Sequence, residues 1–293
     1  MNRGSDRAEQ LEQLRRRREA LAREAWRLGE AAFAADDLAT AASWLDRARR
    51  LAPKNPTVML TLATVWLRQG RAEAEPLFEA LAREHDVRPA WLGLAAARLG
   101  AGDAAGAARA LARTLSGGAG PVDATLQRLA GAVAEAVGAP GWCALSSDGT
   151  LHVGVRTAAD GRLAVALDRR GLRLPRSPAG RYRLPRGWHE ASRLDVTIGG
   201  HALLGSPLDL AAIGRVEGFV ACRDGGIEGW AWLPAAPDTD PLLRIEPERG
   251  RRGFTLVAAD ASIEAPAERP LARPRRFHVD AGRLAALPGP VHV

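Results

Sequence analysis

The sequence has little of several residue types, and each shortage narrows what the protein can be. Cysteine occurs only at Cys143 and Cys222, which form neither a disulfide framework nor a metal-binding spacing, so a reducing, cytoplasmic setting is expected. The six histidines are scattered, and no pair has the spacing of zinc ligands. No run of about 18 apolar residues occurs, so no membrane span is predicted. The amino-terminal residues are polar and charged and lack the apolar core of a secretory signal.

Lysine is almost absent, with Lys54 as its only example. Arginine therefore supplies nearly all of the 41 basic residues, which exceed the 34 acidic residues and give a formal net charge of +7. A basic protein suggests a nucleic-acid partner, but arginine enriched together with alanine, glycine, proline and leucine is typical of a GC-rich bacterial genome. We therefore expect solvated arginines and no nucleic-acid partner, because basic charge alone is weak evidence.

Sequence motifs for catalysis are also missing. The chain has no Gly-X-Ser-X-Gly elbow, no phosphate-binding loop and no Gly-X-Gly-X-X-Gly fingerprint. Asp238 and Asp240 have the Asp-X-Asp form by which many glycosyltransferases hold a metal ion, and two such carboxylates can chelate a hard cation. They lie between Pro237 and Pro241 with no parallel α/β domain before them, which favours a polar turn. The sequence thus predicts no catalytic residue, no cofactor and no metal.

A helical repeat is the most prominent feature that is present. Residues 22–53 read as two short amphipathic helices joined by a tight polar turn at Asp36-Asp37, with small and apolar residues on a shared seam. This order resembles the tetratricopeptide (TPR) repeat, in which small residues let paired helices touch and a proline closes the unit. The residues that carry the resemblance are Leu28, Gly29, Ala32, Leu38, Ala41, Leu45, Ala48 and Pro53.

Two further repeats follow the first. The second begins near Asn55-Pro56 and is degenerate, with a turn at residues 69–71 that we expect to be one residue shorter. The third has its turn at Gly102-Asp103, and a closing helix is predicted over about 122–137. We therefore divide the helical region into a charged lead-in, residues 1–21, and TPR-like repeats with a closing helix, residues 22–138.

The resemblance implies a binding site. In the TPR family the first helix of each pair lines a concave groove that takes a peptide or protein segment. The groove predicted here is mostly apolar, so an apolar helix or extended segment is the expected partner. Its residues, carried over position by position, are Arg23, Trp26, Glu30, Phe33, Met59, Ala63, Trp66, Leu92, Ala96 and Leu99, of which the three from the second repeat depend on its register.

The pattern changes from helical to alternating at Gly141. Apolar residues alternate in residues 151–155, 163–167 and 194–198, and Asp148-Gly149 and Asp160-Gly161 are hairpin turn signals. Short strands with no intervening helix predict antiparallel sandwich-like domains. The predicted fold is therefore α+β in separate domains, an α-helical TPR-like solenoid followed by two small antiparallel β-sandwich-like domains at residues 141–210 and 216–293.

The two β domains are predicted to be copies. Residues 181–198 align without a gap on residues 276–293, and both segments begin Arg-aromatic-X-aliphatic. In the first copy an aliphatic segment follows Ile198, whereas the second copy reaches the equivalent position at Val293. We therefore expect the second domain to be incomplete, with an open strand edge and further chain beyond Val293.

Three tryptophans of the β region allow two interpretations. Trp188, Trp230 and Trp232 could form a platform for glycan contact, because indole rings offer large apolar faces with a polar edge. Alternatively, Trp230 and Trp232 point the same way on one strand and fill a core. The second interpretation is favoured, since this region has few other aromatic residues.

The order of the parts is similar to the N-terminal accessory region of some multidomain bacterial glycosyltransferases. This resemblance implies a non-catalytic, targeting part, with a transferase domain beyond residue 293. The predicted function is a TPR scaffold for protein–protein interaction, belonging to a larger carbohydrate-active protein. The alternatives are a carbohydrate-binding module and a part of the glycosyltransferase itself.

Overall fold

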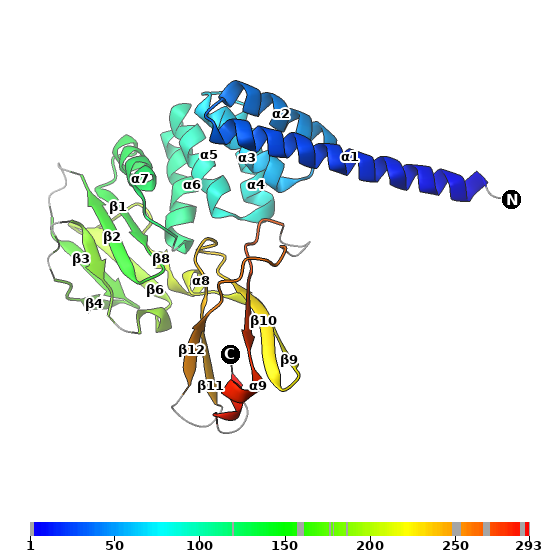
Figure 1. Cartoon of the computed structure of the whole chain (residues 1–293). Helices are drawn as coiled ribbons and strands as arrows, with labels where there is room; N and C mark the ends of the chain where they lie inside the picture. Colours follow the sequence, from blue (N-terminus) through cyan, green and yellow to red (C-terminus); the bar gives the residue numbers. More distant parts are fainter. Residues whose placement is uncertain are drawn as a thin grey trace. The chain divides into compact units, whose positions relative to one another are not determined.

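The computed structural model (Figure 1) has two compact units, Met1–Ala110 and Leu111–Val293. Helices make up the amino-terminal part and small antiparallel sheets follow, so the predicted fold class is confirmed. The domain boundaries given above remain predictions. The structure describes residues 3–118, 120–156, 161–175, 177, 179–185, 187–247, 253–265, 270–287 and 291–292.

In the helical part of the described chain, consecutive helices from α1 to α5 contact one another. The lead-in and the first repeat's first helix form one continuous helix, α1, and the helix α6 crosses the boundary between the two compact units. The helices are α1 (Arg3–Ala34), α2 (Leu38–Leu51), α3 (Pro56–Arg68), α4 (Ala74–His85), α5 (Arg88–Gly100), α6 (Ala104–Gly117) and α7 (Ala124–Ala136).

The turn inside each helix pair has the same geometry three times. Asp36, Gly70 and Gly102 each follow a first helix and have φ values of 62°, 69° and 82°. Each of the next residues donates its backbone N–H at 2.9 Å to the carbonyl oxygen five residues earlier. Such left-handed residues end helices by satisfying their last carbonyl groups, and glycine adopts this conformation at no steric cost.

The second turn is longer than the sequence predicts. Five residues, 69–73, separate α3 from α4, whereas three residues separate α1 from α2 and α5 from α6. The prediction of a shorter turn was therefore wrong. Pro76 lies in the first turn of α4, where its missing N–H costs no hydrogen bond, and α4 begins only two residues before it.

Glycine and alanine let the paired helices approach closely. A Cβ added to Gly29 of α1 would lie 2.6 Å from Cγ of Leu45 in α2, and one added to Gly93 of α5 would collide with the ring of Phe78 in α4. Ala41 and Ala107, predicted to lie at such contacts, are fully buried. The seam identified from the sequence is thus the packed interior of the helix pairs.

The first β unit is a two-sheet sandwich. One sheet has the order β1-β2-β5, the other has the order β4-β3-β6-β7 with β8 also paired to β6, and every ladder is antiparallel. Leu151, Val165 and Val196 belong to one buried cluster drawn from both sheets. The strands are β1 (Gly141–Leu145), β2 (Thr150–Val155), β3 (Leu163–Leu167), β4 (Arg170–Leu172), β5 (Arg181–Arg183), β6 (Arg193–Ile198), β7 (His201–Ala202) and β8 (Leu208–Asp209).

The second β unit repeats this connectivity. Its sheets have the orders β9-β10-β13 and β12-β11-β14, which match β1-β2-β5 and β4-β3-β6 strand for strand. The 3-10 helix Trp188–Glu190 before β6 has its counterpart in α9 (Ala281–Ala285) before β14. In the sequence, α8 (Leu210–Ile213) lies between the two β units. The shared topology supports the duplication. The strands are β9 (Glu217–Arg223), β10 (Gly226–Trp232), β11 (Leu242–Pro247), β12 (Phe254–Val257), β13 (Arg275–Val279) and β14 (Val291–His292).

The hairpin turns contain Asp and Gly residues in the left-handed backbone conformation. Gly149 has φ 81°, and the turn residues Asp224 and Gly225 have φ 51° and 75°. Two consecutive positive φ values in a two-residue loop match the twist of the flanking strands. Asp160 and Val293, which two of the predictions involve, lie outside the described residues.

Candidate protein-binding groove

The ten predicted groove residues lie on α1, α3 and α5, the first helices of the three pairs. These helices are neighbours, since α3 contacts both α1 and α5. The predicted side chains differ in exposure. Arg23 and Glu30 are exposed, Ala63 and Trp66 are buried, and Trp26, Phe33, Met59, Leu92, Ala96 and Leu99 are partly buried.

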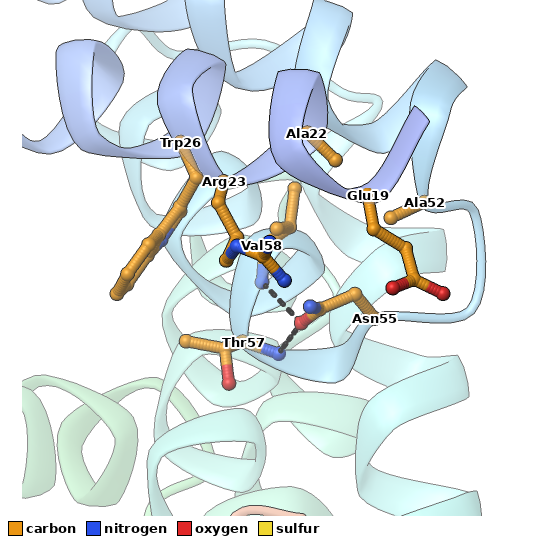
Figure 2. Close-up of a pocket in the computed structure, with 8 residues that line it drawn as sticks. All are labelled: Glu19, Ala22, Arg23, Trp26, Ala52, Asn55, Thr57 and Val58. Carbon is orange, nitrogen blue, oxygen red and sulfur yellow. Dashed lines mark hydrogen bonds between the residues drawn. The ribbon is translucent and has the colours of Figure 1, made fainter. Parts of the chain in front are cut away.

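A pocket of about 300 Å³ lies where α1 meets the amino-terminal end of α3. Figure 2 shows Trp26 and Arg23 reaching from α1 towards Thr57 and Val58 of α3. Of the predicted residues, the structure brings Arg23 and Trp26 to this pocket and leaves the other eight outside its wall. The lining residues are Glu19, Ala22, Arg23, Trp26, Ala52, Asn55, Thr57 and Val58.

Asn55 fixes the α3 side of the pocket. Its side-chain oxygen accepts hydrogen bonds from the backbone N–H groups of Thr57 and Val58, at 3.0 and 3.2 Å (Figure 2). Asparagine at this position satisfies donors that a helix start leaves unpaired, and Pro56 at the first helical position needs none. The pair Asn55-Pro56 therefore sets where α3 begins and which of its side chains face the pocket.

Trp26 is anchored by the helix pair behind it. It packs with Trp44 against Ala25, Ala48 and Val58, which form a small buried cluster. Its indole Nε1 is buried and has no hydrogen-bond partner within the described residues. The ring is thus held by apolar contacts, and its partly exposed surface forms one wall of the pocket.

Some charged residues near the predicted groove residues have a partner in the structure, and Glu30 does not within the described residues. Arg68 contacts Asp36 at 2.6 Å and lies 5.4 Å from the ring centre of Phe33, and Arg71 lies 4.7 Å from that of Trp66. Glu30, between Trp26 and Phe33 on α1, makes no ion pair or hydrogen bond within the described residues. Although the Glu30 side chain is exposed by its surface area, the protein atoms around its carboxyl partly desolvate it and raise its pKa, because desolvation disfavours the charged form. A cationic or N–H group from a partner would stabilise this carboxylate.

Six pocket residues were missed by the sequence argument, which carried over only the groove positions of the first helices. Ala52 and Asn55 lie in the connection between α2 and α3, and Glu19 and Ala22 lie at or before the expected start of the first repeat. The start signal at Asn55-Pro56 was recognised, and it could have placed Thr57 and Val58 in the pocket. The contribution of residue 19 could not be inferred, because it depends on α1 continuing past the repeat.

The three tryptophans proposed for glycan contact lie in different settings. Trp188 belongs to the first β unit, is partly buried and packs against its core near Gly149. In the second unit, Trp232 is buried, whereas Trp230 is partly exposed and lies opposite Phe219 of β9. These positions do not form one continuous row of outward-facing rings on a strand.

The two aspartates considered as a metal site, Asp238 and Asp240, are instead paired with arginines. Asp238 contacts Arg273, and Asp240 accepts a hydrogen bond from Nε of Arg275 at 2.7 Å. Within the described residues, no three His, Cys, Asp or Glu side chains are grouped so as to hold a metal ion. In the same part of the chain, no helix is both long enough and apolar enough to cross a membrane.

Comparison with known families finds a match within the helical region. Residues 32–97 match the tetratricopeptide repeat family. The match runs from the end of α1 into α5 and includes the turns at Asp36 and Gly70. TPR repeats generally mediate protein–protein interaction. A search of curated proteins finds no match to this chain.

Proposed function

We propose that the TPR-like region binds a segment of a partner protein along α1, α3 and α5. The pocket between α1 and α3 carries this proposal. Its volume, about 300 Å³, is near the lower end for ligand pockets and leaves room for one or two side chains. Trp26 and Val58 provide apolar contact, and Arg23, Glu19 and Asn55 provide polar groups at the rim.

The partner segment is apolar, with one large side chain entering the pocket. The partly buried side chains of Phe33, Met59, Leu92 and Leu99 provide further apolar surface along the same helices. Glu30 favours a basic or N–H-bearing group on the partner, because such a group would compensate the desolvation of its carboxylate. An aromatic anchor in a partly preformed pocket typically dominates the binding free energy of such an interface.

The role beside a carbohydrate-active domain stays a separate proposal. It is supported by the order of the parts, helical repeats followed by paired β units, and by the partly exposed Trp230. Direct glycan binding has less support, because a stacking platform needs several exposed ring faces and Trp232 is buried. The ion pairs of Asp238 and Asp240 support a structural turn rather than metal-dependent transfer.

The test uses peptides selected from a random library for binding to the whole chain. Trp26→Ala should weaken the selected peptides by about 2 kcal/mol, or roughly 30-fold. Trp44→Ala is the matched control, because Trp44 packs in the same cluster but lies on α2, outside the pocket wall. Equal loss of binding by the two variants, or peptides that bind Trp26→Ala as well as the unmodified chain, would refute the proposal.

A further inference from the structure

The helix α1 continues past the end of the helix that pairs with it. Near that end, Arg18 donates its Nε hydrogen to the backbone carbonyl oxygen of Leu51, the last residue of α2, at 2.5 Å. A cation at this place complements the negative end of the α2 dipole. Residues 3–17 of α1 precede this contact and run on beyond α2 over about 22 Å (Figure 1).

This extension carries an exposed apolar stripe in line with the buried seam of the first repeat. At the period of an α-helix, Leu11 and Leu14 fall on the same side of α1 as Ala25, within an arc of about 60°. Ala25 is buried against α2 and α3, whereas Leu11 and Leu14 are 52% and 62% exposed. Helices gain most of their stability from packing an apolar face, so this leucine stripe, Leu11 and Leu14, has the pattern of a face that receives another element.

Basic side chains flank the leucine stripe, and acidic side chains lie on the opposite side of the helix. Arg15 and Arg17 lie roughly 80° to either side of the stripe. Both are exposed, and neither makes an ion pair or hydrogen bond within the described residues. Glu9 and Glu12 lie at least about 130° away from the stripe, and Glu12 is paired with Arg16 at 3.0 Å. The face around the stripe is therefore uniformly basic.

We propose that the leucine stripe and its flanking arginines bind an acidic amphipathic helix of a partner protein. The partner helix would lie against residues 9–17 of α1, on the side that α2 covers further along the helix. Its apolar side chains would contact the two leucines, and its carboxylates would pair with Arg15 and Arg17. Apolar contact would provide affinity, and the charges would select the partner, because complementary charges attract the right surface and repel others.

Charge also argues against other occupants of the stripe. The α1 helix of a second copy would bring its own arginines against Arg15 and Arg17 in either orientation, and like charges across a helix pair are destabilising. An anionic membrane would match the arginines, but residues 1–21 contain none of the aromatic side chains that anchor interfacial helices. The stripe lies about 90° around α1 from Trp26, so this inference does not depend on the proposed groove.

The experiment titrates the whole chain into a fluorescently labelled synthetic helix. The helix is three heptads long, with leucine at positions a and d and glutamate at positions e and g. Fluorescence anisotropy should show saturable binding that weakens as salt is added. The control peptide has lysine at positions e and g and should not bind. Leu11→Ala combined with Leu14→Ala should weaken the acidic peptide by about tenfold or more, because the apolar contact is lost.

Charge variants of the protein provide the second arm. Arg17→Gln should weaken the acidic peptide roughly fivefold, because it removes a flanking charge. Arg16→Gln is the matched control and should change the affinity by less than about twofold, because Arg16 lies on the opposite side of the helix. Trp26→Ala should bind the acidic peptide as the unmodified chain does, which separates the stripe from the pocket.

Four results would overturn the proposal. Equal binding of the acidic and basic peptides would show that charge does not select the partner. Loss of the acidic peptide in Trp26→Ala would place it in the pocket. Sedimentation showing a dimer that Leu14→Asp dissociates would assign the stripe to a second copy of the chain. Binding to phosphatidylserine vesicles without binding to the acidic peptide would assign it to a membrane surface.

Discussion

His152 is a single residue through which the stability of the first β unit depends on pH. Its Nε2 lies 2.8 Å from Oγ of Ser146. His152 lies on β2, and Ser146 lies in the turn that joins β1 to β2. Burial lowers the pKa of His152, the positive charge of Arg181 lowers it further, and Asp148 partly opposes this. The imidazole is therefore held neutral in the folded protein at a pH where an exposed histidine, with a pKa near 6.5, begins to bind a proton.

The first prediction follows from the sign of this shift. Because the unfolded chain binds a proton at His152 more readily than the folded chain, stability falls as pH decreases through about 6.5. The thermal midpoint should decrease between pH 7.5 and pH 5.5, and His152→Gln should remove part of that decrease. His201→Gln, on the exposed strand β7, is the control and should leave the pH dependence unchanged. An unaltered pH profile of His152→Gln would contradict the assignment.

At the scale of the element, the effect of a glycine on helix stability depends on whether a neighbouring helix occupies the space beside it. Gly93 in α5 faces the ring of Phe78, whereas Gly131 in α7 faces open space, with no atom near an added Cβ. Both lie in helix interiors, where glycine costs about 1 kcal/mol relative to alanine. Helix propensity therefore favours the same substitution at both positions, but packing opposes it only at Gly93.

The second prediction is that alanine has opposite effects at these positions. Gly93→Ala should lower the free energy of unfolding by ~1–3 kcal/mol, because the added methyl group overpacks the contact between α4 and α5. Gly131→Ala should raise it by ~0.5–1 kcal/mol. Urea unfolding followed by circular dichroism measures both. A Gly93→Ala variant that is as stable as the unmodified chain, or more stable, would show that α5 does not approach α4 as closely as described.

At the scale of the whole molecule, the chain consists of two compact units whose boundary lies within α6. Repeat arrays gain stability mainly from neighbouring helices, and sandwiches gain it from pairing between distant segments. The hydrogen bonds of the two units are therefore expected to open separately, since regions with independent cores unfold as separate cooperative units.

The third prediction tests this independence. In peptide-resolved hydrogen exchange, Gly93→Ala should accelerate exchange in α4 and α5 and leave β3 and β6 at the rate of the unmodified chain. The position of α6 makes it informative, because its exchange reports which unit governs it. Uniform acceleration across β3 and β6 would mean that the two units unfold as one.

Much of the local structure followed from the sequence alone. The period of small and apolar residues predicted the helix pairs, Asp36 and Gly102 marked two of their turns, and Asp148-Gly149 marked a hairpin. Each of these signals acts over fewer than about ten residues, through backbone dihedral preferences and the alternation of apolar side chains. The alignment of residues 181–198 with 276–293 likewise anticipated the shared strand order of the two β units.

Tertiary structure alone decided which of these residues are accessible. Trp26 and Trp66 both lie on first helices of the helix pairs and were both predicted to line the groove, yet Trp26 lines a pocket and Trp66 is buried. Trp142 lies on the edge strand β1, yet it is buried where Leu204, some sixty residues later in the chain, forms a bridge with it. Periodicity assigns a side chain to a face of its element, but exposure depends on whether a distant segment packs against that face.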